Sequence, residues 1–186
     1  ENPAQRTIKA DIRKLQITPT GLKQLSEWVP NGKISISPYL QAIGTLEATG
    51  ALSYRPQYLK SHLNLHTDLG SLAVSGSFAK GNEIEAEVHT PGFQLGKLAG
   101  REEQFGETAF YLSGKGLLRS GAYPALLLQG TIGRFSYNHY DYHDITVDVD
   151  YRKGGFAGNV SINDPHLALT TKGEFNLHSS TPYIKA

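Results

Sequence analysis

The chain contains no cysteine and no methionine, and tryptophan occurs only once. The lack of cysteine excludes disulfides, thiolate metal sites and a cysteine nucleophile. An excess of one charge is also missing, because 18 Lys and Arg residues balance 17 Asp and Glu residues to give a net charge of +1. The basic residues do not cluster in the sequence, so the electrostatic footprint of a nucleic-acid-binding protein is absent.

Long apolar runs are absent as well. No run approaches the ~20 residues that a membrane-spanning helix needs, and the start Glu1-Asn2-Pro3 does not have the pattern of a signal peptide. Because the chain also lacks an initiating methionine, we expect residues 1–186 to be a single segment of a longer protein. Any targeting or anchoring sequence would then lie outside the segment.

The clearest pattern in the sequence runs from Ile145 to Ile162. Apolar and polar residues alternate from Ile145 to Arg152, and the alternation resumes at Phe156 after Lys153-Gly154-Gly155. A period of two places each set of side chains on one face of a strand, and a glycine pair is typical of a tight turn. The stretch therefore predicts a β-hairpin with one apolar and one polar face.

Similar alternation recurs along most of the chain and predicts roughly 14 to 16 antiparallel strands. A phase change near Arg13-Lys14 indicates a bulge in the first strand. One short helix is expected at about residues 19–29, with Thr18 as N-cap and Pro19 in the first helical position. Around residues 90–108 the pattern breaks, and we expect an irregular connection and a weak internal division there.

Together these patterns predict an all-β fold. We expect an elongated antiparallel sheet, rolled into an open taco-like groove or a β-solenoid-like trough, with one short N-terminal helix. The hydrophobic fraction of 39% agrees with sheets that are apolar on one face only.

A glycine recurs on the apolar side of several predicted strands. The pattern appears as Leu46-Ala48-Gly50-Leu52, as Leu72-Val74-Gly76-Phe78 and as Leu126-Leu128-Gly130-Ile132. Glycine within a strand usually marks a bend or the close approach of another group. The repeat is therefore compatible with curvature of the sheet and with space left for a guest molecule.

The residues predicted to line a hydrophobic groove share the apolar parity of their strands. They are Leu46, Leu52, Leu63, Leu65, Leu72, Val74, Phe78, Ile84, Val88, Leu126, Leu128, Ile132, Ile145, Val147, Val149, Phe156, Val160, Ile162, Leu167, Leu169 and Phe175.

Two polar clusters suggest catalytic or metal chemistry. His139, Asp141 and His143 share one strand parity, but positions i and i+4 of a strand lie ~13 Å apart, too far to share one ion. Glu83, Glu85 and Glu87 alternate with apolar residues and are the pattern of a solvated strand face. No nucleophile elbow, phosphate-binding loop or dinucleotide fingerprint occurs, so we expect no catalytic residue, no metal and no cofactor, and an enzyme is not favoured.

The order of several short phrases resembles the C-terminal region of the TamB translocation and assembly module family, within the AsmA-like group. The phrases are Leu72-Ala73-Val74-Ser75-Gly76-Ser77-Phe78, Phe93-Gln94-Leu95-Gly96-Lys97-Leu98, Gly130-Thr131-Ile132 continuing into the segment from Phe135 to Tyr142, and the segment from Gly155 to Pro165. The resemblance extends from about Thr7 to the end of the chain.

The resemblance implies a periplasmic segment of a longer, inner-membrane-anchored protein of Gram-negative bacteria. In that family a β-taco groove is thought to carry phospholipid acyl chains between membranes, in outer-membrane biogenesis and in barrel assembly with an Omp85-type partner. A non-enzymatic lipid-transport segment is thus the first expectation. The alternatives are an interaction module that accepts β-strands of nascent outer-membrane barrels without carrying lipid, and a closed β-barrel with a small apolar ligand.

Overall fold

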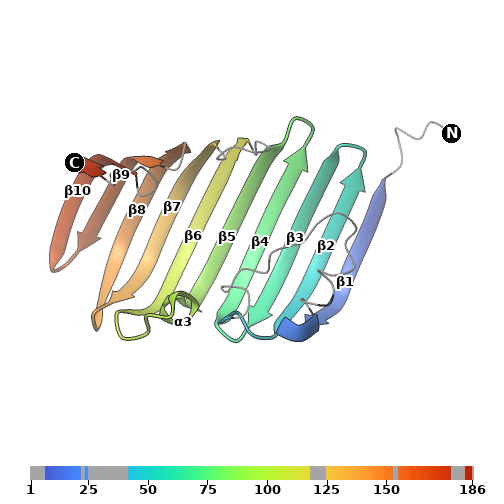
Figure 1. Cartoon of the computed structure of the whole chain (residues 1–186), viewed down its shortest axis with the longest axis horizontal. Coiled ribbons are helices and arrows are strands. Elements are labelled where there is room, and N and C mark those ends of the chain that lie inside the picture. The colour runs from blue at the N-terminus through green and yellow to red at the C-terminus, as the bar shows by residue number, and fades with distance from the viewer. Residues whose placement is uncertain are drawn as a thin grey trace.

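The described part of the chain forms one antiparallel β-sheet of eleven strands, whose arrangement Figure 1 shows. The computed structural model describes residues 7–21, 24, 42–117, 125–152, 155–176 and 183–185. The strands are β1 (Ile8–Ile17), β2 (Leu46–Arg55), β3 (Tyr58–Thr67), β4 (Gly70–Ala79), β5 (Glu83–Gln94), β6 (Phe105–Leu117), β7 (Ala125–Tyr137), β8 (Tyr140–Arg152), β9 (Gly155–Asp164), β10 (Leu167–Asn176) and β11 (Tyr183–Lys185).

Each strand pairs with the strand that follows it in sequence, so the sheet order is β1 to β11 without a crossover. The all-β, open antiparallel sheet predicted from the sequence is confirmed. The two edge strands, β1 and β11, do not pair with one another, and the closed-barrel alternative is therefore wrong. The described residues form eleven strands, fewer than the expected 14 to 16, because most of these strands have 10 to 13 residues and are longer than common strands of about 5–6 residues.

The hairpin predicted from Ile145 to Ile162 is present as part of β8 and β9. The two strands pair in the register Ile145 with Ile162 and Val149 with Gly158. The bulge predicted in the first strand is also confirmed, since the register of β1 against β2 shifts between Ile12 and Leu15. Alternation read from the sequence was sufficient here because both features follow from side-chain parity alone.

The helix expected at residues 19–29 is only partly described. Residues 19–21 and Gln24 are helical, and the Thr18 hydroxyl accepts a hydrogen bond from the amide of Gly21 at 3.2 Å, as expected of an N-cap. The remainder of the predicted helix, including Trp28, lies outside the described residues. No helix in the described ranges has the length and apolar character to cross a membrane.

The region around residues 90–108 is more regular than expected. β5 continues to Gln94, and a single helical turn, α3 (Leu95–Ala99), follows it. Gly100 ends α3 with a φ of 63°, and Arg101 donates to the Gly96 carbonyl at 2.8 Å. The β5–β6 ladder continues to Gln94 with a register shift between Thr90 and Phe93, and residues 95–104 form the expected connection as a helical turn followed by a second turn.

Burial is concentrated at the end of the sheet that carries α3. The buried side chains there are Ala48, Thr67, Leu69, Thr90, Phe93, Thr108, Ile145 and Asp164. Leu69 lies in the turn between β3 and β4, and the others belong to strands that start or finish at this end. The interior of the protein is thus a narrow band along one end of the sheet, and most of the strand surface is left uncovered by the described residues.

Candidate binding face

All the residues predicted to line a groove lie on one face of the sheet. The strand pairings connect them from β2 to β10 without a break in parity. We call this surface the apolar face. For Phe175 the statement rests on its backbone register against Phe156.

The apolar face is organised in rows that run across the strands. Three of these rows lie toward the end of the sheet remote from α3, and the first of them contains Ile12, Gly50, Leu63, Val74, Val88, Leu112, Gly130, Val147, Val160 and Thr171. The middle row contains Ala10, Leu52, Ser61, Gly76, Ala86, Gly114, Leu128, Val149, Gly158 and Gly173. The outer row contains Ile8, Tyr54, Leu59, Phe78, Ile84, Gly116, Leu126, Tyr151, Phe156 and Phe175.

The recurring glycines of this face serve two different purposes. A Cβ on Gly50 would lie 2.1 Å from the His62 carbonyl oxygen, and one on Gly130 would lie 2.1 Å from that of Tyr111. These glycines are required by the backbone, and Gly50 also has a φ of 140°. At Gly76 the nearest backbone atom, the Glu85 carbonyl oxygen, would be 3.2 Å away, and at Gly114 the first contact is the Leu128 side chain. At these two positions no backbone atom lies within 3.0 Å of the built Cβ, so the strand pairing alone does not require glycine there as strictly as at Gly50 and Gly130.

Large apolar side chains of the face are exposed to an unusual degree. Leu59 is 40% exposed, Phe78 39% and Leu169 43%. Only Ala48 and Ile145 of this face are buried apolar residues within the described part of the chain. A protein rarely leaves a connected apolar surface of this extent without a function or a partner.

A narrow hollow of about 240 Å³ lies on the apolar face over β3, β4 and β5. Its floor is formed by Ser61, Gly76 and Ala86 of the middle row, and it is bordered by Val74 on one side and Phe78 on the other. We call it the furrow. It is narrow because the rows of Leu, Val and Phe fill most of the surface between the strands.

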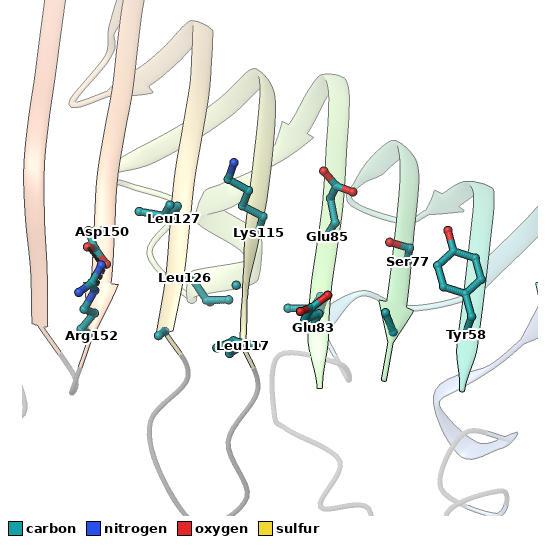
Figure 2. A pocket seen from close by; sticks show the side chains of 14 residues that line it. Tyr58, Ser77, Glu83, Glu85, Lys115, Leu117, Leu126, Leu127, Asp150 and Arg152 are labelled. Carbon is teal, nitrogen blue, oxygen red and sulfur yellow. Dashed lines mark hydrogen bonds and ion pairs between the residues drawn. The ribbon is translucent and has the colours of Figure 1, made fainter. Parts of the chain in front are cut away.

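Larger hollows lie on the opposite, polar face. One of about 620 Å³ extends from Tyr58 to Arg152 at the end of the sheet remote from α3. Figure 2 shows Glu85, Lys115 and Leu127 side by side on β5, β6 and β7. The sequence did not single out this hollow, because its lining combines side chains of six strands.

Acidic and basic groups alternate around this polar hollow. Arg152 is held by Asp150, with its Nε 2.8 Å from Oδ1 and its Nη2 2.7 Å from Oδ2. Glu83 and Glu85 contribute two further carboxylates, and Leu117 and Leu127 supply apolar area at its margin. The three glutamates at positions 83, 85 and 87 are exposed on the polar face, as their alternation predicted.

The histidines are spread over the sheet. His139 occupies a turn with a φ of 65° beside Asn138, whereas His143 lies 3.1 Å from the Gly133 carbonyl oxygen through its Nδ1. His62 contacts Ser75 at 2.6 Å. Within the described ranges, no three His, Asp or Glu side chains lie close enough to hold a metal ion.

A buried carboxylate joins the end of β9 to the start of β8. Asp164 Oδ1 accepts the Tyr140 hydroxyl at 2.6 Å and the His166 amide at 2.9 Å, while Oδ2 accepts the His143 amide at 3.0 Å. The hydrogen bond from Tyr140 and those from the two amides hold the pKa of Asp164 below its usual value, although burial opposes the shift. The same hydrogen bond, with desolvation, raises the pKa of Tyr140 to about 12.

The Tyr140–Asp164 arrangement stabilises a turn and supplies no nucleophile. His166 Nδ1 lies 2.7 Å from the Tyr140 oxygen, so a proton chain exists, but it ends on a carboxylate whose oxygens are already occupied by three donors. Sequence analysis included Asp164 only as part of a phrase. The Asp-Pro pair at 164–165 was the available signal, since such pairs favour turns.

Comparison of the chain with protein-family models, with curated proteins and with solved structures gave no match.

Proposed function

We propose that this chain is a non-enzymatic segment of an envelope-biogenesis protein whose apolar face accommodates phospholipid acyl chains. The observation that carries the proposal is the continuous apolar surface from β1 to β10, which the described residues leave without a covering layer. Domains normally bury such a face against a second layer. Hydrocarbon satisfies the same requirement.

The energy of such binding is sufficient. Each buried CH₂ group contributes about 0.8 kcal/mol, so contact with roughly ten methylene groups on one side would give several kcal/mol without any polar anchor. Because the face carries no charged row between β2 and β6, we expect little discrimination between head groups.

The cellular role in the proposal comes from the resemblance to the TamB family. It places the segment in the periplasm, as part of an inner-membrane-anchored protein that moves phospholipid toward the outer membrane and assists an Omp85-type partner in barrel assembly. The unclosed sheet is compatible with this role, since acyl chains could reach the face from either end of the strand order.

The lipid proposal is tested with the double variant Leu128→Asp, Val160→Asp. Both side chains lie on the apolar face, on β7 and β9, and a carboxylate there is costly beside hydrocarbon. Lipid co-purifying with the protein, measured by mass spectrometry, should fall to background while the β-type circular dichroism persists.

A matched control is Thr131→Asp, Ser161→Asp. It adds the same charges to the same two strands on the polar face, where Thr131 and Ser161 both pair with Thr146. The control should keep the lipid content of the wild type. Lipid retained by the apolar-face variant, or none recovered from the wild type, would contradict the proposal.

A second candidate function is acceptance of a β-strand from a protein partner. The observation in its favour is β1, a ten-residue edge strand whose outer side is paired with no strand among the described residues. Cysteines introduced along β1 should crosslink to an Omp85-type protein in intact cells. Crosslinking without recoverable lipid would favour this function over lipid carriage.

A further inference from the structure

The side chains of the middle row of the apolar face are small on three neighbouring strands, β3, β4 and β5. Between Leu52 on β2 and Leu128 on β7, the row carries only small side chains, and those on β3, β4 and β5 are Ser61, Gly76 and Ala86. The rows on either side keep large residues at the same strands. A furrow one row wide therefore runs perpendicular to the strands.

Gly76 lines the furrow and adds no side chain to its floor. The nearest atoms to a Cβ built there belong to the adjacent strand, with the Glu85 carbonyl oxygen at 3.2 Å and Ala86 Cβ at 3.8 Å. Phe78, which borders the furrow, is 39% exposed. An occupant of the furrow would therefore remove an exposed aromatic surface from water.

A leucine of the middle row stands beyond each end of the furrow floor. A Cβ built on Gly114 would lie 2.9 Å from Leu128 Cδ2, which shows that the Leu128 side chain already fills the space above Gly114. Leu52 stands next to Ser61 at the other end. Between these two leucines the floor spans three strands, or about 10 Å between the outer strand axes.

The lining of the furrow favours a hydrocarbon occupant over a polypeptide. The backbone groups of β3, β4 and β5 are engaged in the sheet ladders, and Ser61 is the only polar side chain of the floor. A polypeptide lying across the strands would bury its own amides and carbonyls without partners, which is unfavourable. A saturated hydrocarbon chain has no such groups.

We propose that the furrow holds one acyl chain, lying across β3, β4 and β5, and that Leu52 and Leu128 limit the length of chain it accepts. This inference rests on the proposed function and specifies where on the apolar face a lipid is held. It describes a resting site of defined length within the face, in place of uniform contact along all strands.

The test is photocrosslinking with phosphatidylethanolamine vesicles in which one acyl chain carries a diazirine near its methyl end. Adducts are located on tryptic peptides by mass spectrometry. We expect them on residues 61–80 and 81–97, which contain the furrow floor of β4 and β5. Ala86→Leu should lower the yield roughly tenfold, equivalent to losing contact with about two methylene groups.

Two other alanine-to-leucine substitutions serve as controls for Ala86→Leu. Ala10→Leu makes the same change in the middle row beyond Leu52, and Ala51→Leu makes it on the polar face of β2. Both should label as the wild type does. Phe78→Ala is a second variant that removes a side chain from an exposed position instead of adding one, and it should also lower the yield.

Leu128→Ala tests the Leu128 end of the furrow directly. It opens the furrow above Gly114, so adducts should extend to the peptide that contains β6. Unchanged labelling of both Ala86→Leu and Phe78→Ala, or adducts spread evenly over the face of a lipid-binding wild type, would overturn the furrow while leaving the proposed function standing. A wild type that binds no lipid overturns both the furrow and the proposed function. If the yield of lipid adducts falls as the protein dimerises, the apolar face is instead assigned to a second copy of the chain.

Discussion

The hydroxyl of Tyr140 lies 2.6 Å from Oδ1 of Asp164, across a separation of 24 residues in the sequence. The bond joins the first residue of β8 to the last residue of β9, beyond the point at which the two strands stop pairing at Ile145 and Ile162. Asp164 thus continues with its side chain a connection that the backbone ladder no longer makes. Its carboxylate is the principal polar anchor at the α3 end of β8 and β9.

Tyr140 should ionise at a higher pH than a free tyrosine. The difference between the ultraviolet tyrosinate titrations of wild type and Tyr140→Phe should have a midpoint near pH 12, matching the raised pKa of about 12. In Asp164→Asn the midpoint should return toward the ordinary value of about 10, because the charged acceptor is gone. A wild-type midpoint near 10 would contradict the hydrogen bond.

The linked change in stability has a defined direction. The folded-state pKa of Tyr140 is raised, so its contribution is complete below the unfolded pKa of about 10 and is lost as the pH rises toward about 12. Circular dichroism at each pH shows whether the sheet is still folded, and so separates the loss of the Tyr140 contribution to stability from unfolding of the whole protein.

Stability in acid should depend on the same pair. The pKa of Asp164 is lowered in the folded state, so its contribution is present above the unfolded pKa of about 3.9 and is lost as the pH falls through the folded value. Tyr140→Phe removes the largest cause of the lowered pKa and should move the acid-unfolding midpoint to higher pH. The midpoint is measured by circular dichroism during acid titration.

Tyr142→Phe is the control for the acid experiment. The Tyr142 ring packs edge-on against Tyr140 at 4.7 Å, and its substitution leaves the Tyr140–Asp164 bond intact. An equal shift in both variants would mean that the loss of a phenolic hydroxyl at this end of the sheet, and not the loss of the Tyr140–Asp164 hydrogen bond, sets the acid midpoint.

Gly50 should tolerate alanine poorly. Its φ of 140° and the 2.1 Å approach of a built Cβ to the His62 carbonyl oxygen require a shift of β2 against β3. We expect Gly50→Ala to lower the free energy of unfolding by on the order of 2 kcal/mol. Gly133→Ala, where a Cβ meets nothing within 4 Å, should be neutral or slightly stabilising; urea denaturation of both variants would show it, and equal losses would refute the backbone requirement.

The bulge in β1 should protect the edge of the sheet. Arg13 and Lys14 lie where the register against β2 shifts between Ile12 and Leu15, and bulges and lysines discourage pairing between edge strands. Deleting Lys14 would straighten β1 and should increase concentration-dependent self-association measured by light scattering. Lys14→Ala keeps the bulge and should associate less; association equal to that of the deletion would instead assign the protection to charge.

Alternation in the sequence was enough to predict the faces of the strands, because a period of two dictates which side chains share a side. It predicted the β8–β9 hairpin, the bulge of β1 and the common parity of the residues from Leu46 to Phe175. It could not predict α3, since the five residues of that helix are too few for a helical period to be recognised.

The alternation of apolar and polar residues does not predict the cross-strand register. Which residue of one strand faces which residue of the next depends on every turn and bulge between them, so the row of Ser61, Gly76 and Ala86 and the place of Leu128 beyond it appear only in the folded sheet. The two roles of the glycines were likewise open until their neighbours were known. Gly50 and Gly76 occupy the same place in the same repeated phrase, yet only the first would collide with backbone.

The amino-acid sequence by itself determined that this protein is a one-sided β-sheet with a continuous apolar face. Only the tertiary structure decided that the sheet stays open, that its buried residues gather at the α3 end and that Asp164 reaches Tyr140. The physical reason is that parity is a local property of each strand, whereas closure, burial and side-chain contacts depend on the summed register of all eleven strands.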